Sequence, residues 1–167
     1  MTKSLLTPEP KWREEADGCI HLSLTVTSEG PGLVERLEAS GCYIQREARE
    51  LLRDFCMADG THEVVVVPCR ELYPLDRKPE SVRTEASRLG YRPPPVEVAL
   101  LIASFTDAEV RDMESRVIIF HEPIVGSDGR PRLLAMCSHF GQRWLRCFYS
   151  AIADEWWAKD RYVFLAP

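Results

Sequence analysis

The chain has 167 residues, of which 45% are hydrophobic and 28% are charged, the proportions of an ordinary soluble globular protein. This length fits one domain, and no apolar run approaches the roughly 18–20 residues that a membrane-spanning helix needs. The formal net charge of −5 argues against nonspecific nucleic-acid binding driven by phosphate neutralisation. Because the N-terminus also lacks the apolar core of a secretory signal, we expect a cytosolic, cytoplasmic protein with no membrane association.

The distribution of charge and the spacing of cysteines and glycines exclude further classes of protein. Residues 1–115 carry 14 basic and 21 acidic residues, whereas residues 116–167 carry 7 basic and 5 acidic residues, so the acidity lies in the front of the chain. The six cysteines stand singly, without a Cys-x-x-Cys pair, which predicts reduced thiols rather than a disulfide framework. The glycines form neither a Gly-x-Gly-x-x-Gly sequence nor a phosphate-binding loop, and we expect no cofactor.

The front of the chain predicts an arm followed by a strand. Residues 1–17 are polar and contain two prolines, so they are expected to form a flexible N-terminal arm ahead of a single domain over residues 18–167. Residues 19–27 alternate apolar and polar side chains. This alternation is typical of a strand with one solvent-exposed face.

Two helices are expected after this strand. The first begins near Thr27 or Ser28, either of which suits the N-cap position, and ends at Gly41. The second covers residues 43–55, where apolar residues recur at helical spacing and charged residues cover the opposite face.

The middle of the chain predicts one strand and three helices. Residues 62–70 form a strand whose four consecutive valines indicate burial on both faces. A helix is expected over residues 79–89. Residues 96–105 are apolar and predict a second helix, for which a strand is an alternative, and residues 106–114 begin with capping-box spacing and predict a third.

Residues 116–149 predict three consecutive strands, around which the rest of the chain is organised. The run at 117–120 is apolar and β-branched without alternation, which indicates a strand buried on both faces. An Asp-Gly turn at 128–129 and a second turn around Gly141 separate the three strands of this meander.

A helical turn at 154–157 and a last strand at 161–166 complete the predicted elements. Strands and helices do not alternate regularly, which argues against a doubly wound sheet. The sequence therefore predicts an α+β fold: a single domain with a mixed or mainly antiparallel sheet of about six strands and helices packed mostly on one side.

Several side chains are candidates for the site of a small hydrolase-like enzyme. They are His121, Glu122, Asp128, Cys137, His139 and His21. Adjacent strand residues such as His121 and Glu122 point to opposite faces, so they cannot form one site alone. Cys137 and His139 are two apart and share a side of their strand, as a nucleophile and its base require. Since no spacing matches a metal or catalytic motif, we predict no metal site and favour a structural role in which His121 and Glu122 contact backbone or an arginine.

Arginines alternate with aromatic residues near the end of the meander. On a strand, Trp144, Arg146 and Phe148 share one face, where they would stack bases and hold phosphates of a single-stranded nucleic acid, and Arg130, Arg132 and Arg143 would enlarge the basic surface. The alternative is that the aromatic rings pack under helices and Arg146 lies at the rim. The acidic net charge disfavours a nucleic-acid partner.

Trp156 and Trp157 form a second unusual cluster. In a helix, adjacent tryptophans point about 100° apart, so one can be buried while the other is exposed. Exposed tryptophan is favoured in protein interfaces. The alternative is that both rings close the end of the sheet.

Four segments resemble a group of small uncharacterised bacterial proteins. They are VRTEASRLGY, PVEVALLIASFTDAEVRDM, HEPIVGSDGRPRLL and GQRWL, and together they cover roughly residues 82–145. The resemblance implies a bacterial-type cytosolic protein and supplies no catalytic residues.

The sequence thus favours a non-enzymatic module that binds a protein partner or forms a homo-oligomer. Its binding surface would comprise Trp144, Arg146, Trp156 and Trp157. A hydrolase that uses His121, Glu122 and His139, or a single-stranded nucleic-acid binder, remains the alternative.

Overall fold

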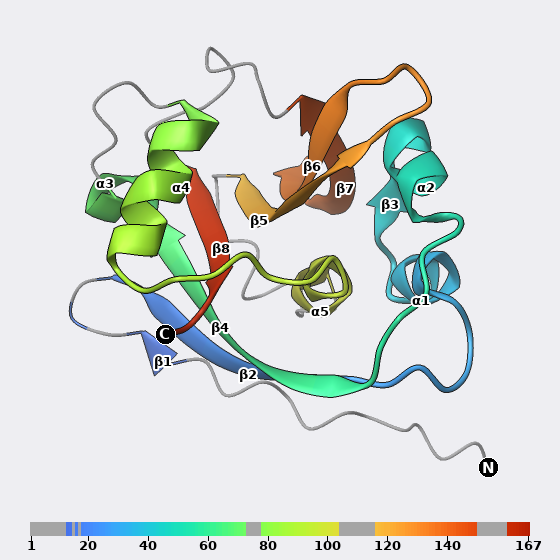
Figure 1. Ribbon diagram of the computed structural model, residues 1–167. Helices are drawn as coiled ribbons and strands as arrows, with labels where there is room; N and C mark the ends of the chain where they lie inside the picture. The colour runs from blue at the N-terminus through green and yellow to red at the C-terminus, as the bar shows by residue number, and fades with distance from the viewer. Residues whose placement is uncertain (1–12, 15, 17, 73–77, 104–115, 150–159) are drawn as a thin grey trace.

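The computed structural model describes residues 13–14, 16, 18–72, 78–103, 116–149 and 160–167. The predictions for residues 1–12, 106–114 and 154–157 therefore lie outside the described residues. Within these ranges the chain forms one mixed sheet with helices on both of its faces (Figure 1).

The sheet has the strand order β1-β2-β4-β8-β5-β6-β7-β3. Neighbouring strands are antiparallel except for two parallel pairs, β5 with β8 and β3 with β7. The strands are β1 (Arg13–Glu14), β2 (Ile20–Val26), β3 (Tyr43–Ile44), β4 (Gly60–Pro68), β5 (Val117–Val125), β6 (Pro131–His139), β7 (Gln142–Tyr149) and β8 (Arg161–Leu165).

Five helices pack on the two faces of the sheet within the described ranges. They are α1 (Leu33–Ala39), α2 (Arg46–Leu52), α3 (Cys69–Leu72), α4 (Pro79–Arg88) and α5 (Val98–Ala103). Side chains of α1, α2 and α5 belong to one apolar core, and side chains of α3 and α4 belong to another. In Figure 1, α3 and α4 lie together at the left, and α1 and α2 lie at the right.

Strands β4 and β5 contribute to both cores, because their residues are apolar without alternation. Val64 and Val66 of β4 face one core, and the two valines between and after them face the other. Val117 and Ile118 of β5 divide in the same way. The predicted burial of these strands on both faces is confirmed.

The α+β class and the mixed sheet are confirmed, with two corrections to the finer prediction. The sheet has more strands than the six expected, because two-residue strands pair at its edges. The helices cover both faces, since strands buried on both faces need apolar partners on each side.

The predicted meander is confirmed as β5, β6 and β7, paired antiparallel in that order. The strand expected at 19–27 is β2, the helix expected at 79–89 is α4, and the final strand is β8. The apolar segment at 96–105 forms the helix α5, which decides between the two alternatives in favour of a helix.

Two predictions about the front helices are wrong. Tyr43 and Ile44 do not start the second helix, because they pair in parallel with Trp144 and Leu145 of β7. The first helix has Gly32 as its N-cap, without a side-chain hydrogen bond, instead of Thr27 or Ser28. The backbone N–H of Ser28 instead donates to the carboxylate of Asp59 in the opposite loop.

Strand β5 carries an irregularity beside β6. Ile119 is opposite Leu134, whereas Ile124 is opposite Arg132, so residues 120–123 face the single residue Leu133. Such a bulge leaves ladder groups without their usual partners. Pro123, which has no N–H to donate, lies within this bulge.

Candidate functional site

His121 lies in the bulge of β5 and is 1% exposed. The backbone N–H of Leu134 donates to its Nε2 at 2.9 Å, so Nε2 carries no proton and the Nδ1–H donates to the carbonyl of Glu122 at 2.7 Å. The imidazole thus replaces a backbone carbonyl that the bulge has moved away. Burial, opposed by the hydrogen bond to Glu122 and assisted by nearby Arg83, lowers the pKa of His121 to about 4.

Glu122 points into solvent beside Arg83. The Glu122 carboxylate lies 3.9 Å from the Arg83 guanidinium, which also donates to the carbonyl of His121 at 2.9 Å. The same guanidinium lies 4.9 Å from the ring centroid of Phe120. These are the backbone and arginine contacts of a structural pair.

The remaining candidates for a hydrolase site are not brought together. His139 is exposed at the end of β6, five residues beyond the Leu134 amide that binds His121, a separation of about 17 Å along a strand. Asp128 lies in the β5–β6 turn, where it accepts from the Arg130 backbone at 3.1 Å and from the Arg132 guanidinium at 2.7 Å. His21 lies on β2, which β4, β8 and β5 separate from β6.

Cys137 and His139 share the face that the sequence predicted, but burial of the thiol outweighs the effect of the nearby Arg146 and Arg116. Burial raises the pKa of Cys137, so the thiol is protonated at neutral pH. Within the described ranges, no group of three or more His, Cys, Asp or Glu side chains could hold a metal ion.

The aromatic and arginine residues of β7 do gather at one edge of the sheet. Trp144 pairs with Cys137 on β6 and with Tyr43 on β3. The rings of Tyr43 and Trp144 stack with centroids 5.1 Å apart and an interplanar angle of 23°. The Arg146 guanidinium lies 5.5 Å from the centroid of the Trp144 ring, within the range of a cation–π contact.

This cluster is partly open to solvent. Tyr43 is 49% exposed, although it is an aromatic residue, and Trp144 and Arg146 are half-buried. Among the described residues, no carboxylate lies within ion-pair distance of Arg146. We call Tyr43, Trp144 and Arg146 the aromatic–arginine surface.

The side chains of Arg143 and Phe148 have structural roles and do not belong to this surface. The guanidinium of Arg143 donates to the carbonyl of Ala103 in α5 and to the carbonyl of Ser40 at the end of α1. Phe148 packs against the core under α3 and α4, with the Arg116 guanidinium 5.0 Å from its ring. Of the basic residues on β7 that were proposed for nucleic-acid binding, Arg146 stays on the open surface. Arg130 is also exposed but lies in the β5–β6 turn, and the Arg132 guanidinium pairs with Asp128.

The turn between β6 and β7 carries a residue that the sequence reasoning missed. Phe140 and Gly141 connect the pair His139 and Gln142, and their φ angles are +50° and +73°. Two positive φ angles are the requirement of a type I′ hairpin turn, where asparagine and glycine are usual. Phe140 is 93% exposed, and its ring packs edge-on against the ring of His139, with the two ring centroids 4.3 Å apart. The Phe-Gly pair inside a predicted turn was the available signal.

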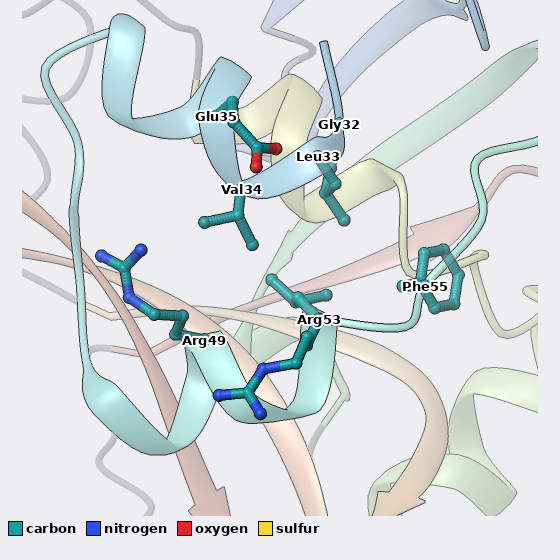
Figure 2. Close-up of a pocket in the computed structure, with 8 residues that line it drawn as sticks. Gly32, Leu33, Val34, Glu35, Arg49, Arg53 and Phe55 are labelled. Carbon is teal, nitrogen blue, oxygen red and sulfur yellow. The ribbon is translucent and has the colours of Figure 1, made fainter.

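A pocket of about 240 Å³ lies between α1 and α2. Its apolar wall comes from Leu33, Val34, Leu52 and Phe55, and the other lining residues are Gly32, Glu35, Arg49 and Arg53. Figure 2 shows the side chain of Val34 pointing from α1 toward α2, with the guanidinium groups of Arg49 and Arg53 on the α2 side. We call it the α1–α2 pocket.

Trp156 and Trp157 lie outside the described residues, so their predicted role in binding stays a prediction. No helix of the described ranges is long and apolar enough to span a membrane. Comparison with protein-family models, with curated proteins and with solved structures found no match. The bacterial origin and the cytosolic location implied by the sequence therefore stay predictions as well.

Proposed function

We propose that the protein is a non-enzymatic protein-binding module that associates with a second copy of itself through the aromatic–arginine surface. The observation that carries this proposal is the stack of a half-exposed tyrosine, Tyr43, on Trp144, with the guanidinium of Arg146 on the same indole. Tyrosine, tryptophan and arginine are the residues most enriched in interface hot spots.

The location of these residues supports the proposal. Two of them come from the meander and one from a two-residue strand about a hundred positions earlier, so the fold assembles the surface at one edge of the sheet. An arginine without a described carboxylate partner at such an edge is available for a partner's acidic group or aromatic ring.

The two alternatives have less support. A hydrolase would need His121 and His139 near a common point, but one imidazole is buried in the sheet and the other is exposed at a hairpin end. A nucleic-acid surface would need Arg143, whose guanidinium is held by two backbone carbonyls.

Sedimentation velocity over a concentration series tests the proposal. We expect the wild-type chain to associate as its concentration approaches about 1 mM, where even an association free energy near 4 kcal/mol is measurable. The double variant Tyr43→Ser/Arg146→Glu should stay monomeric. Val125→Ser is the matched control, because Val125 is 64% exposed but lies at the β5–β6 turn. A wild-type chain that stays monomeric, or a double variant that associates like wild type, would contradict the proposal.

A further inference from the structure

The type I′ turn explains the positive φ of residue 140, but it does not explain why a bulky, exposed phenylalanine occupies this position. Its φ of +50° lies in the left-handed region, which is unfavourable for a bulky side chain. Its side chain is 93% exposed, and among the described residues its ring contacts only that of His139. Strained residues persist where they serve a function, and an exposed aromatic ring on a rigid hairpin is suited to enter a pocket.

The α1–α2 pocket has the size and chemistry to receive such a ring. Its volume of about 240 Å³ exceeds the roughly 150 Å³ of a cavity that already holds benzene. Val34 and Phe55 give apolar contacts, and Arg53 belongs to the lining on the α2 side. Arg53 is exposed and has no ion pair with a described residue.

The charges around the two partners also differ in sign. The β6–β7 hairpin, residues 131–149, carries three arginines and no acidic residue, a charge of +3. Residues 33–54 carry five acidic residues and four arginines, a charge of −1. The pocket lining holds one glutamate and two arginines, so the acidic excess lies in the residues around the pocket, which carry −2. Opposite charges on two surfaces favour their association and fix its orientation.

We infer that Phe140 of one copy occupies the α1–α2 pocket of a second copy. This inference rests on the proposed self-association and names the contact that orders it. Because the tip and the pocket are different parts of the chain, the contact is head-to-tail and leaves one free tip and one free pocket at each stage. A contact built around one phenyl ring buries about 150–250 Å² of that side chain, so we expect weak, concentration-dependent chains of copies rather than a closed dimer.

Two complementary variants test this contact. Phe140→Asn removes the ring from the tip and suits the turn, and Val34→Gln places a polar side chain in the pocket wall. Each variant alone should raise the dissociation constant at least tenfold in sedimentation velocity. An equimolar mixture should form heterodimers that do not grow further. The Phe140→Asn variant keeps an intact pocket, which can receive the intact tip of the Val34→Gln variant, and no further tip or pocket is then intact. Val125→Ser again serves as the control.

The outcomes separate this inference from the proposed function. If Tyr43→Ser/Arg146→Glu prevents association while Phe140→Asn and Val34→Gln do not, the tip–pocket contact is refuted and the proposed function stands. If both single variants are monomeric but their mixture is monomeric too, the contact is refuted. A wild-type chain that is monomeric up to about 1 mM refutes both. Should Val34→Gln unfold, Val34→Thr replaces it, which adds a hydroxyl to the pocket wall at nearly unchanged side-chain volume and should raise the dissociation constant in the same direction by a smaller factor.

Discussion

At residue 121 an imidazole takes the place of a backbone carbonyl in the ladder between β5 and β6. Nε2 accepts the Leu134 N–H, and the bulge that brings the ring there also accommodates Pro123. The arrangement requires a neutral ring, since a protonated Nε2 would point a second donor at the Leu134 N–H. His121 is therefore a part of the sheet whose charge state is coupled to folding.

The coupling predicts a loss of stability in mild acid. The pKa of His121 is about 4 in the folded chain and 6.5 when the chain is unfolded, so the unfolded state binds more protons between these values. The contribution of His121 is complete above pH 6.5 and decreases as the pH falls toward 4, by up to about 3 kcal/mol. Urea unfolding of the wild type and of His121→Gln at pH 7 and pH 4.5 measures it. Equal pH dependence in the two chains would contradict the assignment.

At the tip of the β6–β7 hairpin we predict a substitution that stabilises the folded chain. Phe140→Asn places a residue that tolerates left-handed φ at the first position of the turn, and we expect the free energy of unfolding to rise by about 1 kcal/mol. Gly141→Ala should lower it by a similar amount, because φ is +73° there although an added Cβ would meet no atom within 4 Å. Thermal unfolding checks both. Destabilisation by Phe140→Asn would mean that the ring supports its own fold.

At the scale of elements, long-range pairing decides where local patterns fail. The runs of valine and isoleucine in β4 and β5 are sufficient to predict strands with two buried faces. The helical spacing that starts at residue 43 is locally consistent, but Tyr43–Ile44 joins β7, which comes a hundred residues later. No local pattern contains that information.

The candidate site was predictable to a similar extent. The shared face of Trp144 and Arg146 follows from strand alternation alone. The contribution of Tyr43 was missed because its strand was missed. Arg143 was predicted to lie on the surface because the strand pattern does not show its partners, which are the carbonyl of Ala103 in α5 and the carbonyl of Ser40 at the end of α1. The exposure of Phe140 depends on the absence of a covering element, which a sequence pattern does not show.

Arg143 holds two helices to the sheet edge, and this predicts a stability effect specific to that position. Arg143→Met removes both hydrogen bonds to the helix carbonyls and should lower the free energy of unfolding by about 2 kcal/mol. Arg146→Met, three residues along the same strand, should cost less than about 1 kcal/mol, because the Arg146 guanidinium lies over the Trp144 ring and forms no ion pair with a carboxylate of the described residues. Chemical denaturation compares the two. Equal costs would show that Arg143 does not tie the helices to β7.

At the scale of the whole molecule, the uneven distribution of charge along the chain corresponds to two different surfaces, the helices α1 and α2 and the β6–β7 hairpin. Helices α1 and α2 carry four acidic residues and three arginines, a charge of −1, whereas the hairpin of β6 and β7 carries three arginines and no acidic residue. Two copies can therefore meet with the hairpin of one facing the helices of the other. Trp144 and Arg146 of the aromatic–arginine surface lie on the same strand pair as the tip of the hairpin, and Trp144 is four residues after Phe140.

The most direct measurement is a ¹H–¹⁵N correlation spectrum recorded on dilution from about 1 mM to about 50 µM, a range that brackets a weak association. The account predicts concentration-dependent amide shifts at Tyr43, Phe140, Trp144 and Arg146 and along α1 and α2, with constant shifts along β2 and β4. Spectra that do not change on dilution, or changes confined to other exposed apolar positions such as Leu89 and Val125, would contradict it.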